Sequence, residues 1–158
     1  MRRSLALLAT LAVACPLPLG AAEKRPKFPI LDPPVRLHVA ISESATKNPS
    51  TLKWKLDEIR KRLAPNKKKE WRYHYWLQLV DRPEDAEVLL ELTDYERKIL
   101  GHGYMDIIYL SATMARAGST VKTPITARAL EKDNATVEEY LLFKVCDAVE
   151  PFTRDRVK

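Results

Sequence analysis

Hydrophobic and polar residues alternate along VRLHVAIS, residues 35–42. The apolar positions are Val35, Leu37, Val39 and Ile41. A period of two residues is typical of a strand that buries one of its faces. We therefore expect the folded domain to begin with a half-buried strand.

The apolar period lengthens after residue 50. The apolar stripe consists of Leu52, Leu56, Ile59 and Leu63, spaced four, three and four residues apart. This spacing predicts an amphipathic helix, with Lys55, Arg62 and the other charged residues on its remaining faces. We expect Ser50 to cap the start of the helix, and Pro65 with Asn66 to end it.

Residues 67–80, KKKEWRYHYWLQLV, fit two patterns. With a period of two, one face carries Trp71, Tyr73, Tyr75, Leu77 and Leu79. A helix would instead place Trp71, Tyr75 and Leu79 on one stripe. We prefer a strand that packs its aromatic rings under a helix, because aromatic residues favour strands. That register leaves Arg72, His74 and Trp76 on the opposite, polar side.

Shorter patterns complete the chain. Residues 81–86 predict one helical turn, with Asp81 as its cap and Pro83 early in it. Strands are predicted at 87–95, 104–116 and 120–130, and Pro124 puts the last of these at a sheet edge or a bulge. A capping box of Thr136 and Glu139 opens the final helix. Its apolar stripe is Val137, Leu141, Val145, Ala148 and Phe152.

The predicted order is therefore β-α-β-β-β-β-α. Two amphipathic helices need an apolar surface to cover, so we expect a two-layer α/β sandwich of the α+β class, with one mostly antiparallel sheet of about four or five strands and both helices on one face. The first two strands should be parallel, since a helix connects them.

The first 22 residues have the composition of a secretory signal. Arg2 and Arg3 precede an uncharged stretch that ends in small residues at Ala22. Its mostly apolar part, residues 5–14, is shorter than the roughly 20 residues of a membrane-spanning helix. Alternatively, the sequence AVAC at 12–15 resembles a lipobox, in which case Cys15 carries a lipid.

The remaining chain divides into three parts. Residues 23–34 contain four prolines and predict an extended tether. Residues 35–153 suffice for a single α+β domain. The polar tail 154–158 is expected to fray.

Net charge and cysteine content restrict the function. The chain carries 27 basic and 21 acidic residues. Removal of Arg2 and Arg3 with the signal leaves 25 − 21 = +4, which is too mild to predict nucleic-acid binding. Cys146 would then be the single cysteine of the mature chain, and its place within a helix predicts a buried structural thiol.

The sequence offers little support for catalysis or for metal binding. GxSxG and HExxH are missing, and His38, His74 and His102 lack the short spacing of a zinc site, so we predict no metal and no cofactor. Four residues near one loop are candidates for acid/base chemistry in a hydrolase of envelope glycans or peptides. They are Asp94, Glu96, His102 and Asp106.

Basic residues gather around the end of the first helix. They are Arg60, Lys61, Arg62, Lys67, Lys68, Lys69 and Arg72. Cations at a helix C-terminus complement its dipole, so part of the cluster needs no partner. The whole cluster is a candidate binding patch for an acidic protein or an anionic envelope surface.

The element order, together with DRPEDAEVLLEL at 81–92, is similar to small periplasmic domains of bacterial envelope assembly proteins, although no functional residue follows from that resemblance. We therefore predict an exported, non-enzymatic binding or assembly module of the cell envelope. It would be periplasmic or secreted, or a lipoprotein held by Cys15, without a transmembrane helix in the mature chain. Its partner would be another envelope protein or an anionic surface, met by the basic patch or by a sheet edge at 122–130. The hydrolase is the alternative.

Overall fold

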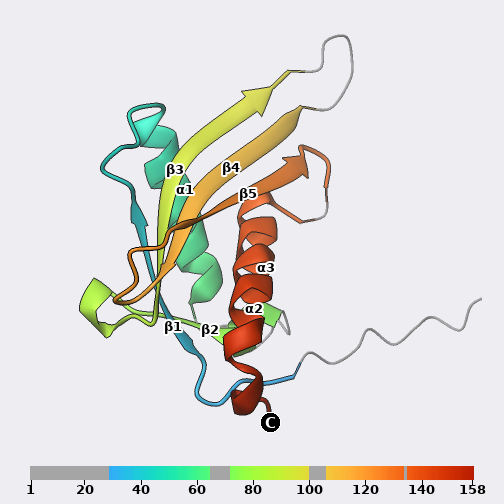
Figure 1. Cartoon of the computed structure of the whole chain (residues 1–158). Helices are drawn as coiled ribbons and strands as arrows, with labels where there is room; N and C mark the ends of the chain where they lie inside the picture. The colour runs from blue at the N-terminus through green and yellow to red at the C-terminus, as the bar shows by residue number, and fades with distance from the viewer. Residues whose placement is uncertain (1–28, 65–71, 100–105, 134) are drawn as a thin grey trace, which may run out of the picture.

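The computed structural model describes residues 29–64, 72–99, 106–133 and 135–158, without the side chains of Arg72 and His74. Five strands form one sheet in the order β2-β1-β3-β4-β5 (Figure 1). They are β1 (Val35–Ile41), β2 (Leu77–Leu79), β3 (Val88–Lys98), β4 (Ile107–Arg116) and β5 (Thr123–Leu130). Helices α1 (Pro49–Leu63) and α3 (Val137–Val149) pack on one face of the sheet. The predicted α+β sandwich is thus confirmed.

The sheet is mixed, with β1 parallel to both β2 and β3, and β4 antiparallel to β3 and β5. The parallel pairing of β1 and β2 was expected, but the expectation of a mostly antiparallel sheet is corrected, because half of the pairings are parallel. A parallel connection usually needs about a dozen residues or more. Here residues 80–87 suffice because β2 and β3 are offset: Leu79 and Val88 both lie level with Leu37.

The core lies between the sheet and the two helices. Alternate strand residues point into it, as the period of two predicts. They are Val35, Leu37, Val39, Val88, Leu90, Leu92, Leu110, Ala112, Met114, Ile125, Ala127 and Ala129. The apolar stripes of both helices cover this layer: Leu52, Leu56, Ile59 and Leu63 from α1, and Val137, Leu141 and Val145 from α3.

Residues Arg72–Trp76 form a short helix, α2, so the strand predicted over 71–80 is wrong except at β2. Tyr73 and Trp76 are 0% and 2% exposed, and their spacing of three places them on one helical face. Tyr73 packs against Phe143, with ring centroids 5.8 Å apart. The indole N–H of Trp76 donates to Pro29 O. Tyr75 is only half-buried, and Trp71 lies outside the described residues.

The helix caps are partly those expected. The Thr136–Glu139 capping box of α3 is present. Helix α1 instead begins after Asn48, which has a left-handed backbone (φ 52°), and Pro49 is its first residue, so Ser50 is not its cap. The side-chain amide of Asn48 donates to Tyr95 O at 3.1 Å. The turn after β2 is a 3₁₀ helix at Pro83–Asp85, capped at Arg82 rather than Asp81.

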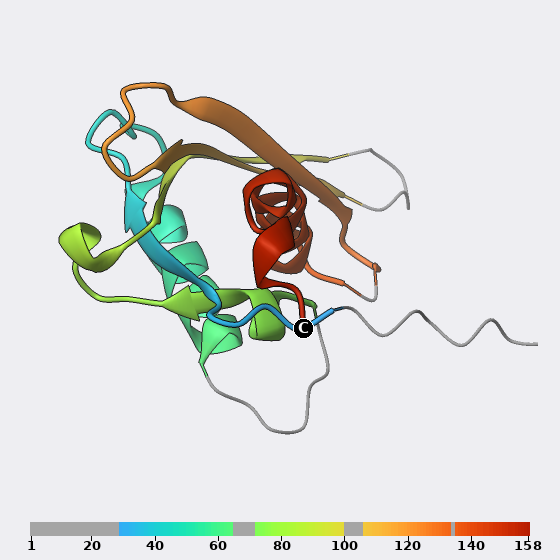
Figure 2. The ribbon, with the colours of Figure 1, turned by 60° about the horizontal axis from the view of Figure 1, so that its bottom comes forward.

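The two ends of the described chain pair with each other (Figure 2). Leu31 is buried and forms a bridge with Val157, and Arg156 makes a 2.7 Å ion pair with Glu87. The last residues of the expected tether and the tail that was expected to fray are therefore packed together. The buried Leu31 side chain explains this difference, because it gives the N-terminal segment an apolar anchor.

Because α2 is a helix, substitutions of its neighbouring aromatic residues should reduce the free energy of unfolding by different amounts. Trp76→Ala should lower the free energy of unfolding by about 3–5 kcal/mol, since it leaves a cavity in the core. Tyr75→Ala is the matched control and should have a clearly smaller effect. Urea unfolding followed by circular dichroism measures both. A larger loss for Tyr75→Ala than for Trp76→Ala would support the strand register instead.

Candidate functional site

Two ion pairs join α1 to α3. Lys55 Nζ lies 2.6 Å from Glu138 Oε1, and Arg62 Nη1 lies 2.7 Å from Glu139 Oε1. The Lys55 and Glu138 side chains are 6% and 3% exposed. Lys55 and Arg62 are seven residues apart, about two helical turns, so both point from α1 to the start of α3. The apolar pattern had not distinguished them from the other charged residues of α1.

Glu139 serves the cap and the helix interface at the same time. Its Oε2 accepts the Thr136 N–H at 3.0 Å, while its Oε1 accepts from Arg62. Tyr73 of α2 lies beside this pair, and burial raises the pKa of its hydroxyl. The first turn of α3 is therefore fixed by both α1 and α2.

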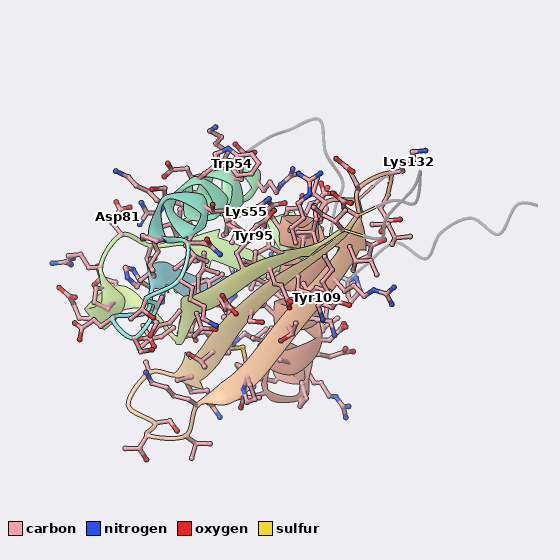
Figure 3. The ribbon with its side chains drawn as sticks, turned by 90° about the horizontal axis from the view of Figure 1, so that it is seen from above. Trp54, Lys55, Asp81, Tyr95, Tyr109 and Lys132 are labelled. Carbon is pink, nitrogen blue, oxygen red and sulfur yellow. The ribbon has the colours of Figure 1, made fainter. Side chains whose placement is uncertain are left out.

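The Lys55 ammonium is also held by aromatic rings. Its Nζ lies 4.2 Å from the ring centroid of Trp54 and 5.4 Å from that of Tyr95, and Figure 3 shows these three side chains gathered above the sheet. Burial alone would raise the pKa of Glu138, but hydrogen bonds, that from Lys55 first, outweigh it and lower this pKa below its ordinary value. Glu138 is thus charged at neutral pH and neutralises Lys55.

A hollow of about 280 Å³ opens beside this pair, between α1, the start of α3 and the ends of β4 and β5. Its apolar lining consists of Ile108, Ala129, Leu130, Ala135 and Val137. Trp54, which is 55% exposed, also lines it. Carboxylates of Glu58, Glu131 and Asp133 lie around it. We call this site, including Trp54 and the three carboxylates, the α1–α3 cleft.

The acidic candidates of the predicted hydrolase are engaged by neighbours. Asp106 is buried and pairs with Arg97, and Asp94 Oδ1 accepts the Tyr95 N–H at 2.9 Å. Glu96 lies 3.7 Å from Lys98. A hollow of about 530 Å³ adjoins Asp94 and Glu96, but Asp106 does not line it. His102 lies outside the described residues.

The residues of the predicted basic patch differ in their contacts. Arg62 turns inward to Glu139, Lys61 pairs with Glu58 at 2.8 Å, and Arg60 donates to Val39 O at 3.4 Å. Lys67, Lys68 and Lys69 lie outside the described residues, and nothing is described of the Arg72 side chain. The basic patch thus stays a prediction for these four, while Arg62 belongs to the helix interface.

Strand β5 is a sheet edge, as Pro124 suggested. Since Glu131 N–H donates to Asp106 O, alternation along the antiparallel ladder turns the backbone groups of Pro124, Thr126, Arg128 and Leu130 away from β4. Asp133 binds both the N–H and the C=O of Leu130, and proline has no N–H. Along β5 the outward donors that remain for a partner strand are those of Thr126 and Arg128. This edge is therefore protected at both ends.

His38 and Cys146 occupy ordinary structural positions. His38 Nδ1 lies 3.3 Å from Val80 O, and the ring lines a hollow of about 470 Å³ with Ser42, Glu91 and Lys122. Cys146 is fully buried in α3. Among the described residues, no three His, Cys, Asp or Glu side chains are grouped as a metal site would need.

Comparison with known proteins gives no relative from which a function could be transferred: no known family matches the chain, and no curated protein is significantly similar to it. In the part of the chain that the structure describes, no helix is both long and apolar enough to cross a membrane. The site must therefore be interpreted from its own chemistry.

The buried Lys55–Glu138 pair predicts a large non-additive effect. Lys55→Met should lower the free energy of unfolding by about 3–5 kcal/mol, because Glu138 stays buried without its cation. Combining it with Glu138→Leu should restore most of that stability, since the two apolar side chains pack together. Lys61→Met, which breaks an exposed pair on the same helix, is the control and should change little. Additive losses from the two buried substitutions, measured by urea unfolding, would contradict a direct pair.

Proposed function

We propose that the protein is an exported, non-enzymatic binding or assembly module of the cell envelope, and that it receives a segment of a partner protein in the α1–α3 cleft. The observation that carries this proposal is the exposed indole of Trp54 on the wall of an apolar hollow. Large aromatic side chains beside apolar pockets are typical of the residues that dominate protein–protein binding.

The charges around the cleft support a binding role. The two cations that line it, buried Lys55 and partly buried Arg62, are neutralised by Glu138 and Glu139 at 2.6 and 2.7 Å. A partner can therefore cover this end of the helices without leaving an isolated charge in an apolar environment. Lys55 also contacts the Trp54 ring at 4.2 Å, and a ring that is held before binding loses less entropy when a complex forms.

The position of the cleft suits a tethered protein. The first described residues enter the fold beside the C-terminus, at the start of β1 (Figure 2). Tyr95 lies on β3 beyond the residues that pair with β1, so the cleft is at the other end of the sheet (Figure 1). A chain held by a lipid on Cys15, at the start of the N-terminal segment, would present the cleft away from the anchor.

The other predicted contact surfaces have less support. The β5 edge offers two outward N–H donors, which is little for the addition of a partner strand. Two residues of the basic patch are held within the chain, Arg62 by Glu139 and Arg60 by the carbonyl of Val39. We therefore favour the cleft over both.

Site-specific photo-crosslinking in the organism that makes the protein tests this proposal. A photoreactive phenylalanine at position 54 should capture an exported protein, because the indole that it replaces faces the partner. Position 121 is the matched control, since Val121 is also exposed and apolar but lies in the turn at the other end of β5. The same products from both positions, or none from position 54, would contradict the proposed surface. Products formed only with cytoplasmic proteins would contradict export.

A further inference from the structure

We infer that the α1–α3 cleft binds a cationic side chain, Lys or Arg, next to a bulky aliphatic side chain in an extended segment of the partner. This inference rests on the proposed function and adds the chemistry of the bound segment. It follows from the size of the apolar floor, from the carboxylates around it and from the surroundings of the Trp54 ring.

The apolar floor is small. The hollow above it has a volume of about 280 Å³, just below the roughly 300–1,000 Å³ of pockets that enclose whole drug-sized molecules. It suits one or two aliphatic side chains, which would contact Ile108, Leu130 and Val137. The partner therefore inserts a short anchor here rather than a folded surface.

The carboxylates around this floor favour a cation. Asp133 accepts a backbone N–H from Leu130 and has no cationic partner among the described residues. Glu131 pairs with Arg97 at 3.1 Å, and about half of each side chain is exposed. Glu58 pairs with Lys61, whose side chain is 70% exposed. Solvated ion pairs of this kind are weak. A ligand cation can therefore replace Arg97 or Lys61 with little loss of stability.

An anionic ligand would find no comparable partner. The cations that line the cleft, Lys55 and Arg62, are held by Glu138 and Glu139. The same two glutamates lie in the first turn of α3, where they already complement the helix dipole. A bound anion would therefore meet repulsion from these carboxylates and from Glu131 and Asp133.

Trp54 supplies the second contact for a cation. The ammonium of Lys55 lies 4.2 Å from its ring centroid, yet the residue is 55% exposed. The exposed part of the ring is open to a second cation, and Arg or Lys over an indole is a favourable pair. A ligand cation between Trp54 and the carboxylates would thus repeat the environment that the protein gives to Lys55.

Binding of labelled hexapeptides to the whole mature chain tests this inference. Fluorescence anisotropy with fluorescein-GLRKLG should show saturable binding that weakens as salt is added. The probes GLEELG and GLQQLG, and a fully N-acetylated and therefore uncharged chitotetraose measured by calorimetry, should bind at least about tenfold more weakly, a difference that corresponds to the loss of one favourable charged contact.

Three variants localise the binding. Trp54→Ala should weaken binding of GLRKLG about tenfold or more, and Glu131→Gln with Asp133→Asn should weaken it by a smaller factor while keeping the shape of both side chains. The control is Glu43→Gln with Asp81→Asn, which removes the same charge from two exposed positions away from the cleft and should leave binding unchanged.

The outcomes separate this inference from the proposed function. Equal or tighter binding of GLEELG, GLQQLG or chitotetraose, still lost in Trp54→Ala, would overturn the cationic ligand and keep the cleft as a site. Equal weakening by the control pair would show nonspecific attraction and overturn the inference. Failure of GLRKLG to bind at millimolar concentration would overturn it as well, whereas failure of the proposed function would appear as crosslinking that does not depend on position 54.

Discussion

The buried contact between Lys55 and Glu138, with its neighbour Arg62–Glu139, fixes how α1 lies against α3. Each cation comes from a helix whose apolar stripe faces the sheet, and each carboxylate comes from the first turn of α3. Because Lys55, Glu138 and Glu139 are buried, sliding one helix would leave charges buried without partners. The pairs therefore set the register of the helix layer, the position of Trp54 and the shape of the cleft beside it.

Register is a better account of these pairs than stability alone. A well-packed apolar pair of similar size is often as stabilising as a buried ion pair, since two charges must be removed from water. An apolar interface, however, would carry no penalty from unpaired buried charges in a shifted alignment of α1 on α3. Glu139 adds a further restriction, because it holds both the Thr136 N–H and Arg62. The α3 cap therefore forms with α1 in one alignment.

Local signals in the sequence predicted much of the fold. The alternation over 35–42, the stripe of α1 and the capping box at Thr136 depend on residues close together in the chain, and each appears as expected. The mixture of helices and strands then required one sheet with one covered face. The strand pairing was harder to predict from the sequence. The parallel pairing of β1 with β3 depends on the offset between β2 and β3 along the sheet.

The candidate site was less predictable because its contacts join distant residues. Lys55 lies four positions before Ile59, at the border of the apolar stripe, but its partner is 83 residues away. Nothing local distinguishes it from Lys53 or Lys61. In α2 the sequence fits both a strand and a helix, and packing of Tyr73 and Trp76 in the core favours the helix. The chain ends were misjudged for a similar reason, because Leu31 and Val157 pair only in the folded chain.

The proposed role of Trp54 and of the carboxylates around it is to contact a partner protein. Hydrogen–deuterium exchange of the protein alone and of its complex with the captured partner measures this most directly. The account predicts added protection in residues 51–58 and 129–138, with the β5 backbone at 124–128 and the turn at 82–86 unchanged. Protection along 124–128, with the first turns of α1 and α3 unaffected, would contradict it and indicate strand addition at the sheet edge.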